Sequence, residues 1–269
     1  MKSADFAEGV RLMRLFDTHC HLDDEQFSAD RPGVIQRALD AGVSTMLAVG
    51  VTADSSRACA ELAEQNTAVV AAVGIQPNYC AEVKPDDWDQ VISLVERSSV
   101  VALGETGLDR HWDYAPFDLQ QDFFDRHLRL SQQHDVPFIV HMRDCESDIL
   151  VMLREARQRG GLRGVMHSFT GSAETARECL ELGLYISFAG MVTYKKSTDL
   201  REIATQVPDN RILIETDAPY LSPHPKRGQR PNEPALVVHT AECLAAARGV
   251  SPQQFAAQST ENGERLFGI

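Results

Sequence analysis

Histidines and carboxylates recur at the ends of several apolar segments, and side chains of these types can bind divalent metal ions. His19 and His21 end the first segment two residues apart, so in a strand both side chains point to the same face. One His-x-His pair is a weak indicator of a site, but four later segments end in a residue of the same class. The candidate ligands are His19, His21, Glu105, His141, His167 and Asp217.

Imidazoles and carboxylates gathered at one place would desolvate and repel one another without a cation. A divalent metal ion removes this conflict, because neutral imidazole and carboxylate are natural ligands of Zn²⁺, Mn²⁺ and similar ions. If the fold brings these segment ends together, the sequence therefore predicts a metal site.

Eight short apolar segments alternate with longer amphipathic stretches. They span residues 15–21, 44–50, 69–77, 100–109, 136–144, 164–169, 184–190 and 211–219. Nearly continuous apolar runs suit strands buried on both faces. Residues 117–134 show the period of a helix that covers a sheet. Strict alternation predicts a parallel sheet, and eight units favour its closure into a barrel.

The chain length supports a barrel, since 269 residues is close to the ~250 typical of that fold. No linker divides the chain, and no glycine-rich dinucleotide fingerprint follows the first strand. We predict an α/β fold, a single (β/α)8 TIM barrel over residues 15–269, preceded by an N-terminal extension over residues 1–14. In such a barrel the carboxyl ends of all strands meet at one face, where its active sites lie.

The net charge, the apolar segments and the cysteines of the chain restrict its possible functions and cellular locations. The formal net charge of −13 argues against a broad basic surface that coats nucleic acid, but not against an enzyme that holds one strand end. The first residues lack the features of a secretory signal, and no apolar run approaches the ~20 residues that cross a bilayer. We expect a cytoplasmic protein without membrane contact. The six cysteines include no Cys-x-x-Cys pair, so we expect reduced thiols, with Cys20 packed in the core.

Five segments carry a resemblance to a known family. They are FDTHCHL at 16–22, GETGLD at 104–109, HMRD at 141–144, HSFTG at 167–171 and ETDAPY at 215–220. The chain resembles the TatD family of metal-dependent hydrolases, within the wider amidohydrolase-like barrels, from about Leu15 to its carboxyl end.

This resemblance implies a site with two divalent metal ions. One ion would be held by His19, His21 and Asp217, the other by His141 and His167, with Glu105 as the bridge. Two ions about 3.5–4 Å apart polarise a phosphoryl oxygen and activate water. Asp217 is the candidate to orient that water and accept its proton, with a role as a ligand alone left open. The metal is also open between Zn²⁺, Mn²⁺ and Mg²⁺.

The sequence departs from the family at one position. The family often shows Gly-[Ile/Val]-His-Pro after the third strand, where this chain has Gln76. Glutamine can bind substrate but cannot titrate near neutrality. Asp109, Arg143 and Asp144 are candidates to aim ligand histidines or contact a substrate phosphate, although Arg143 and Asp144 could instead pair with each other.

A cationic segment follows the eighth strand. Lys226, Arg227 and Arg230 stand out in an acidic chain, and an anionic substrate such as a terminal phosphodiester would suit them. A solvated turn with surface charges is the alternative. Lys195 and Lys196 form a similar, smaller group. Signatures of sequence-specific nucleic-acid recognition are missing from the sequence.

The leading hypothesis is a phosphodiesterase, a TatD-like deoxyribonuclease that acts as an exonuclease on single-stranded DNA. A second is hydrolysis at carbon, of a cyclic amide or of an ester as in a D-aminoacyl-tRNA deacylase. A third is a metal-binding module without activity, which only Gln76 suggests. The sequence leaves the physiological substrate, the polarity of digestion and the oligomeric state open.

Overall fold

The computed structural model describes residues 13–269, so the predicted extension over residues 1–14 lies outside the described residues except for Met13 and Arg14. Eight parallel strands form one sheet in the order β1 to β8. The strands are β1 (Leu15–Cys20), β2 (Val43–Val49), β3 (Val69–Val73), β4 (Val100–Asp109), β5 (Phe138–Arg143), β6 (Gly164–Met166), β7 (Tyr185–Phe188) and β8 (Ile212–Ile214). The predicted (β/α)8 TIM barrel is confirmed.

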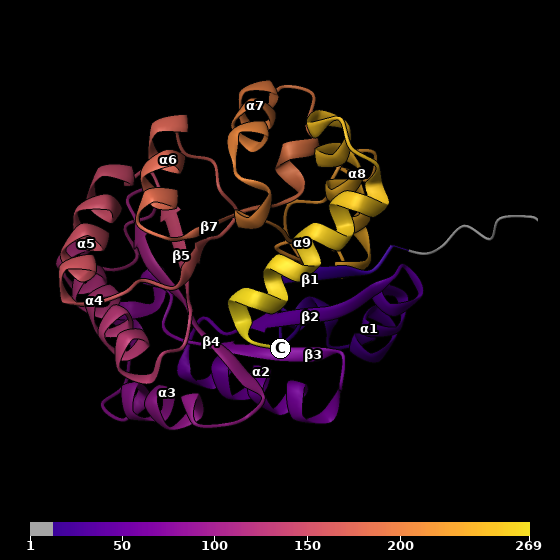
Figure 1. The fold of residues 1–269 in the computed structure, drawn as a ribbon. Coiled ribbons are helices and arrows are strands. Elements are labelled where there is room, and N and C mark those ends of the chain that lie inside the picture. Colours follow the sequence, from indigo (N-terminus) through magenta and orange to yellow (C-terminus); the bar gives the residue numbers. More distant parts are fainter. Residues whose placement is uncertain (1–12) are drawn as a thin grey trace, which may run out of the picture.

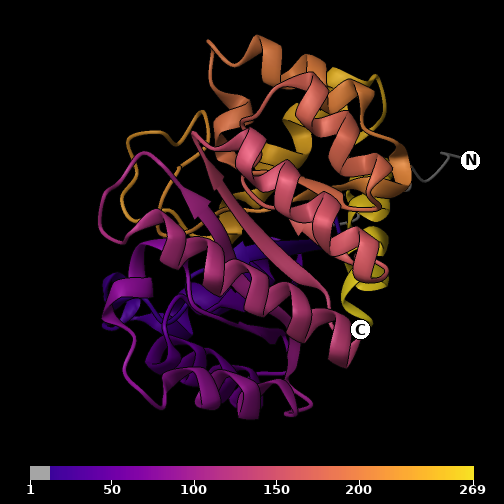
Figure 2. The ribbon, with the colours of Figure 1, turned by 90° about the vertical axis from the view of Figure 1, so that its left-hand side faces the viewer.

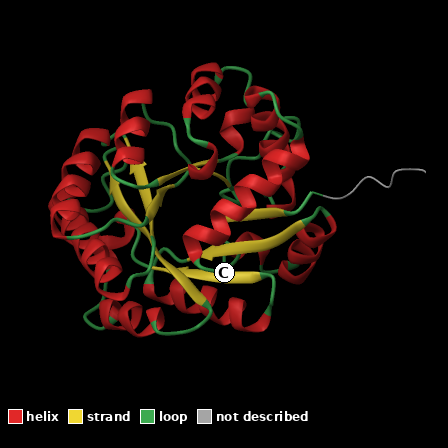
Figure 3. Cartoon of the chain, in the orientation of Figure 1, coloured by secondary structure: helices red, strands yellow, loops and turns green. Residues whose placement is uncertain are grey.

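Helices alternate with the strands and surround them (Figures 1 and 3). They are α1 (Arg31–Asp40), α2 (Ala53–Gln65), α3 (Asp87–Val95), α4 (Phe117–His134), α5 (Glu146–Arg159), α6 (Ala173–Glu181), α7 (Thr198–Gln206), α8 (Val237–Arg248) and α9 (Pro252–Phe267). Figure 2, turned by 90°, shows them running alongside the strands on the outside. Among residues 13–269, none of these helices has the length and apolar character needed to span a bilayer.

Two helices illustrate how local sequence sets these elements. α4 has the predicted bounds and buries Phe123, Phe124 and Leu128 against the sheet, as its apolar period requires. α9 begins with Pro252, and the Ser251 hydroxyl caps it by accepting a hydrogen bond from the backbone of Gln254 at 3.2 Å. The predicted start of this helix is confirmed.

The first and last strands close the barrel. Cys20 and Ala218 form a parallel bridge, and the backbone nitrogen of His21 donates to the carbonyl of Ala218 at 2.8 Å. The backbone nitrogen of Asp217 donates to the carbonyl of His19 at 2.9 Å. Closure of the barrel therefore places residues at and just after the end of the first strand beside residues that follow the last strand.

One end of the barrel is sealed. Side chains from all eight strands fill the interior, and Leu266 and Phe267 of α9 join this cluster. The Asn262 amide donates to the carbonyl of Ile212 at 2.9 Å, which fixes α9 at the start of β8. Figure 1 shows α9 lying across the strands. α9 blocks the end of the barrel at which the strands begin. The other end, where the strands finish, is therefore the open mouth.

Several strands end earlier than predicted. β1, β6 and β8 stop before His21, His167 and Asp217, which the sequence analysis placed within them. The apolar character continues beyond the paired strands, but the backbone turns out of the sheet there. Asp217 has a φ of 54° and Ser168 one of 43°, in the left-handed region that a strand does not allow. Three ligand candidates therefore project from the turns after their strands.

Candidate metal centre

Glu105 lies at the centre of the predicted ligand set. This buried β4 carboxylate has Oε1 2.8 Å from His141 Nδ1 and 3.2 Å from His167 Nε2. Its other oxygen, Oε2, lies 3.5 Å from His19 Nε2 and 3.9 Å from His21 Nε2. The two carboxylate oxygens thus face two different pairs of imidazoles.

Asp217 completes one of the two groups. Its Oδ1 lies 3.5 Å from His21 Nε2 and 3.8 Å from His19 Nε2. The ligand atoms of His19, His21 and Asp217 lie within 4.8 Å of one another, and so do those of His19, Glu105 and His167. The structure therefore brings all six predicted ligand residues together at the open mouth of the barrel.

The donor set fits divalent metal ions. His19 Nε2 and His21 Nε2 lie 3.3 Å apart and face the same carboxylates. Neutral imidazole nitrogens with carboxylate oxygens are the ligands that Zn²⁺ and Mn²⁺ prefer, and carboxylates also suit Mg²⁺. The residues present can hold such ions.

The electrostatics of these groups shows why a cation is needed. Burial raises the pKa of the Glu105 carboxyl, but His167, His141 and His19 together hold it well below its usual value. Burial lowers the pKa of His21, yet Asp217 outweighs this and raises it to about 9. Glu105 and Asp217 are therefore stabilised in their charged form by positive charge on the neighbouring histidines. Bound divalent ions would supply that charge and leave the imidazoles neutral.

Asp109 contacts His141 on the side of the ring away from Glu105. Its Oδ2 lies 2.9 Å from His141 Nε2, which leaves His141 Nδ1 to face Glu105. The same oxygen accepts from the Asn78 amide at 3.1 Å. Asp109 thus contacts a candidate ligand histidine, which matches one of the two roles that the sequence analysis considered for it, and outer partners of metal sites commonly make such contacts.

Glu215 contacts another candidate ligand, His167, and the sequence analysis did not consider it as a functional residue. Its Oε1 lies 3.1 Å from His167 Nδ1 and accepts from the backbone nitrogen of Ser168 at 2.7 Å. The signal was present, because Glu215 directly follows β8 and belongs to the ETDAPY segment that also carries Asp217.

Asp17 is a second missed carboxyl. It is fully buried, which raises its pKa to about 8, and Oδ1 accepts from the backbone nitrogen of Thr216 at 2.8 Å. Its Oδ2 accepts from the Thr216 hydroxyl at 2.5 Å. Asp17 thus joins the strand that carries His19 to the turn that carries Asp217.

A glycine in β4 allows two ligand strands to approach closely. Gly107 has a φ of 130°, and a Cβ at this position would lie 2.1 Å from the carbonyl oxygen of His141. Any other residue would separate β4 from β5 or distort both. The close approach keeps Glu105 within reach of His141.

The predicted substrate contacts lie around the mouth. Gln76 is buried, and its side-chain oxygen accepts from the backbone of Asn78 at 2.8 Å. Asp144 lies 3.1 Å from His111 Nδ1, and not against Arg143 as one alternative held. Arg143 extends toward Trp112, with its guanidinium carbon 5.6 Å from the centre of the indole ring.

The cationic loop after β8 carries free charge. Arg227 lies over the ring of Tyr194 at 4.0 Å, and Arg230 donates to the Ser222 hydroxyl at 3.0 Å. Within residues 13–269, neither arginine nor Lys226 forms an ion pair with a carboxylate. Their charge is therefore available to an anionic ligand.

Cys20 does not belong to the ligand set. It is fully buried, and its thiol donates to the carbonyl of Leu47 at 3.4 Å. Alternation along β1 sends it away from His19 and His21, as predicted. All six cysteines are free thiols.

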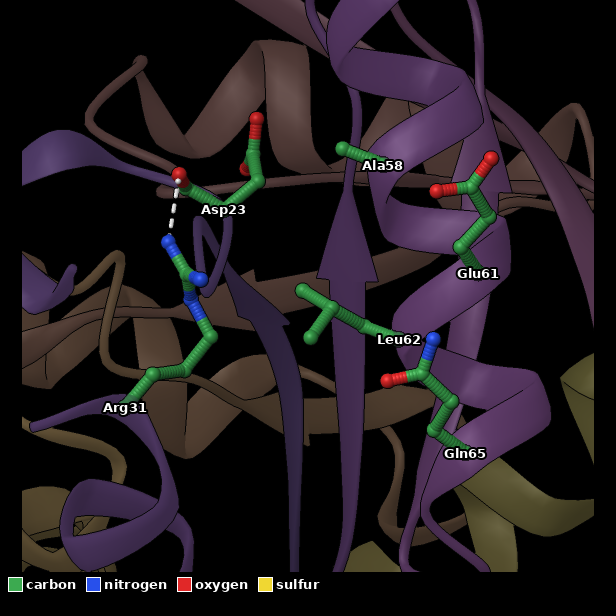
Figure 4. Close-up of a pocket in the computed structure, with 6 residues that line it drawn as sticks. All are labelled: Asp23, Arg31, Ala58, Glu61, Leu62 and Gln65. Atoms are coloured by element: carbon green, nitrogen blue, oxygen red, sulfur yellow. Dashed lines mark hydrogen bonds between the residues drawn. The ribbon is translucent and has the colours of Figure 1, made fainter.

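A cleft of about 170 Å³ lies apart from this centre, beside α2 (Figure 4). It is lined by Asp23, Arg31, Ala58, Glu61, Leu62 and Gln65. The Arg31 guanidinium donates to the backbone carbonyls of Leu22 at 2.5 Å and Asp23 at 3.0 Å. Two of its three nitrogens are therefore occupied by backbone carbonyls, and none of the six candidate ligands lines this cleft.

Comparison with known proteins agrees with the geometry. The sequence matches the family of TatD related DNases over residues 16–268. It is 39% identical over 255 residues to an uncharacterized metal-dependent hydrolase of Bacillus subtilis, YabD, covering 95% of this chain and 99% of the relative. It is 36% identical over 260 residues to a 3'-5' ssDNA/RNA exonuclease, TatD of Citrobacter rodentium, covering 95% of this chain and 98% of the relative.

A solved structure shows the same arrangement of the chain. The TatD homologue YjjV of Escherichia coli superimposes with a TM-score of 0.89 at 30% identity, covering 96% of this chain and 100% of that one. The family match, the relatives and this structure all extend over nearly the whole barrel. The chain belongs to the TatD family of metal-dependent hydrolases.

Proposed function

We propose that this protein is a metal-dependent phosphodiesterase that removes nucleotides from the 3' end of single-stranded DNA. The observation that carries the proposal is the position of Glu105, whose two oxygens face two separate pairs of imidazoles. Relatives named 3'-5' ssDNA/RNA exonucleases support both the substrate and the direction.

We infer two metal positions from the family resemblance and from the contacts of Glu105. His19, His21 and Asp217 would hold one ion, His141 and His167 the other, and Glu105 would bridge them. When bound, two divalent ions polarise a phosphoryl oxygen and bring the pKa of a water molecule toward neutrality. The four imidazoles favour Zn²⁺ or Mn²⁺ by ligand preference. Mg²⁺ is the third candidate.

Asp217 is suited to accept the proton of the attacking water. Its side chain is 15% exposed, whereas that of Glu105 is 5% exposed. Its Oδ1 faces the histidines, and within residues 13–269 its Oδ2 has no hydrogen-bond partner. One oxygen can thus bind a metal ion while the other takes the proton.

Positive and polar side chains around the mouth would hold the substrate. Arg143 and the loop residues Lys226, Arg227 and Arg230 can contact phosphates, and Gln76 can donate a hydrogen bond beside the scissile group. Their local placement is compatible with an acidic protein that holds only the end of one strand.

The substrate class is tested with metal-loaded protein and single-stranded oligonucleotides blocked at either end. The assay is repeated with Mg²⁺, Mn²⁺ and Zn²⁺, and in parallel with D-aminoacyl-tRNA and small cyclic amides. Release of mononucleotides from a free 3' end, and not from a blocked one, supports the proposal. Turnover of only the ester or the amide would assign hydrolysis at carbon, and no turnover with any metal would indicate a binding module.

Ligand variants connect activity to the metal centre. Glu105→Ala and His141→Ala should each abolish hydrolysis while the circular dichroism spectrum remains that of the wild type. Glu174→Ala, at an exposed position at the start of α6, is the matched control and should keep full activity. Wild-type rates in both ligand variants would refute the assignment of the site.

A further inference from the structure

The exposed aromatic side chains gather at the open mouth of the barrel. Within residues 13–269 the exposed tyrosines and tryptophans are Tyr79, Trp112, Tyr114 and Tyr220, and each stands in a connection that follows a strand, Tyr79 in a short 3-10 helix. The other large exposed apolar side chains are aliphatic and lie in α1, in α5 and at the carboxyl end. Scattered exposed apolar residues are ordinary, but this segregation by type and place indicates a function.

Two of these aromatics form a stacked pair. The rings of Trp112 and Tyr114 have centroids 5.4 Å apart and are inclined by only 6°. Trp112 is 42% exposed and Tyr114 is 60% exposed. Parallel stacking leaves ring surface open to a further planar group.

The loop that carries this pair is anchored. The backbone nitrogens of His111 and Trp112 donate to Asp109 Oδ1 at 2.8 and 3.1 Å. Arg110 forms two hydrogen bonds with Asp148, each of 2.9 Å. The exposure of the aromatic rings is therefore a property of a fixed loop.

The same contacts connect the pair to the metal centre. Asp109, whose Oδ1 holds the loop, directs Oδ2 toward His141 Nε2 at 2.9 Å. The carboxylate of Asp109 therefore contacts both the backbone of Trp112 and His141, a candidate ligand. The aromatic pair lies at the rim of the site and not elsewhere on the protein.

A free cation lies next to the pair. The guanidinium of Arg143 lies 5.6 Å from the centre of the Trp112 ring, and Arg143 follows His141 by two residues in β5. Within residues 13–269, Arg143 forms no ion pair with a carboxylate. An aromatic surface beside an uncommitted arginine presents the two features that a nucleotide requires, one for the base and one for the phosphate.

We propose that Trp112 and Tyr114 form a platform on which one nucleobase of a single-stranded nucleic acid stacks while a neighbouring phosphodiester lies in the metal centre. This inference rests on the proposed nuclease function and adds a base-binding site to it. Arg143 contacts the phosphate beside the stacked base. Because every base has a π-face, the platform holds the strand with little preference for sequence.

Tryptophan fluorescence tests the platform directly, since the chain has only two tryptophans. Trp88 packs against Phe123 and His127, so Trp88→Phe leaves Trp112 as the reporter. Metal-loaded Trp88→Phe protein is titrated with a phosphorothioate-linked oligothymidylate that resists hydrolysis. An oligomer of abasic residues with the same length and number of phosphates is the matched ligand, and Trp88→Phe/Trp112→Phe supplies the background.

The expected result is saturable quenching by oligothymidylate, with about tenfold weaker binding of the abasic oligomer. Equal quenching by both ligands would show that only phosphates are bound, and no quenching would show that the bases stay away from Trp112. Either result would overturn the platform. Circular dichroism of both variants verifies that they fold.

Kinetics separates this inference from the proposed function. Trp112→Ala should raise KM for an oligonucleotide about tenfold with little change in kcat, and Trp112→Phe should restore most of the affinity. Val151→Ala removes an exposed side chain from α5 and should change neither value. Hydrolysis with unaltered KM in Trp112→Ala would reject the platform and keep the nuclease. Base-dependent quenching without hydrolysis by any metal form would keep the platform and reject the nuclease.

Discussion

Glu215 holds the ring of His167 from the side opposite to Glu105. Its Oε1 lies 3.1 Å from His167 Nδ1, whereas Glu105 Oε1 lies 3.2 Å from Nε2 of the same ring. Each nitrogen of this imidazole therefore faces a different carboxylate. The outer contact fixes the tautomer that presents Nε2 to a metal ion and increases its basicity.

Loss of this outer contact should weaken metal binding. Glu215→Ala is expected to reduce the affinity for the ion at His141 and His167 by about 10- to 100-fold, because the ring is then free to rotate. Competition with a chromogenic chelator measures the affinity. Glu174→Ala is the control, since that exposed carboxylate lies outside the site. Unchanged affinity in Glu215→Ala would show that the surrounding packing alone orients the ring.

Removal of metal should lower thermal stability. The carboxylates of Glu105 and Asp217 then lack divalent charge, and the histidines around them must be protonated instead. An ion at 100 times its Kd stabilises the fold by about 2.7 kcal/mol. We expect the Tm of chelator-treated protein to rise steadily with added metal, as followed by differential scanning fluorimetry.

The His19→Ala variant is the matched control for this metal titration. It removes an imidazole that belongs to both clusters of side chains whose ligand atoms lie within 4.8 Å of one another. Its Tm should respond much less to the same metal concentrations. A flat response in the wild type would contradict the assignment of a metal centre, and an equal response in the variant would place the binding elsewhere.

Most of the fold could be predicted from the sequence because strand and helix periods are local properties. The amphipathic period of residues 117–134 gave the bounds of α4, and the apolar segments gave all eight strands. Several predicted strands extended beyond the carboxyl ends of the observed strands. The left-handed backbone at Ser168 and Asp217 is imposed by closure and by distant contacts, which no local pattern records.

The convergence of the six candidate ligands could be predicted because each lies in or directly after an apolar segment, toward its carboxyl end, and parallel closure brings these ends together. The side chains that contact and orient these candidate ligands were harder to predict from the sequence. Asp109 was a candidate, but Glu215 and Asp17 were not, since their roles depend on His167 and Thr216, which lie far away in the sequence. Similarly, Asp144 contacts His111, a partner that no spacing rule suggests.

The buried His127 should make the protein sensitive to acid. Burial lowers its pKa to about 4, while its ring bonds to the carbonyl of Phe123 at 2.7 Å and the backbone nitrogen of Ile75 at 3.1 Å. The unfolded chain has the ordinary value of 6.5 and binds the proton more readily. The free energy of unfolding should therefore fall as the pH drops from about 6.5 to about 4, by about 1.4 kcal/mol per pH unit.

The measurement is urea unfolding at several pH values for the wild type and for His127→Gln. The variant lacks the titrating group, so its stability should decline less steeply over this range. The slopes are compared rather than the absolute stabilities, because glutamine does not reproduce both hydrogen bonds of the ring. Equal slopes would show that other groups cause the acid sensitivity.

The cationic loop after β8 should control the salt dependence of substrate binding. Lys226, Arg227 and Arg230 form no ion pair within residues 13–269, so their charge can displace counterions from a single strand. Replacement of all three by alanine should raise KM for an oligonucleotide and reduce the slope of log KM against log salt by about 2, at ~0.7 per charge. Hydrolysis rates across a range of NaCl concentrations measure both quantities.

A control with the same change in net charge separates local contact from long-range attraction. Arg97, Arg126 and Arg129 lie away from the mouth, each paired with a carboxylate at 3.3, 2.6 and 2.6 Å respectively. Their replacement by alanine alters the total charge equally but removes no cation from the mouth, so the salt slope should stay near that of the wild type. Equal reductions in both triple variants would mean that the loop contributes only to the overall field. A reduction confined to the loop variant would show that phosphates lie against these three side chains during hydrolysis.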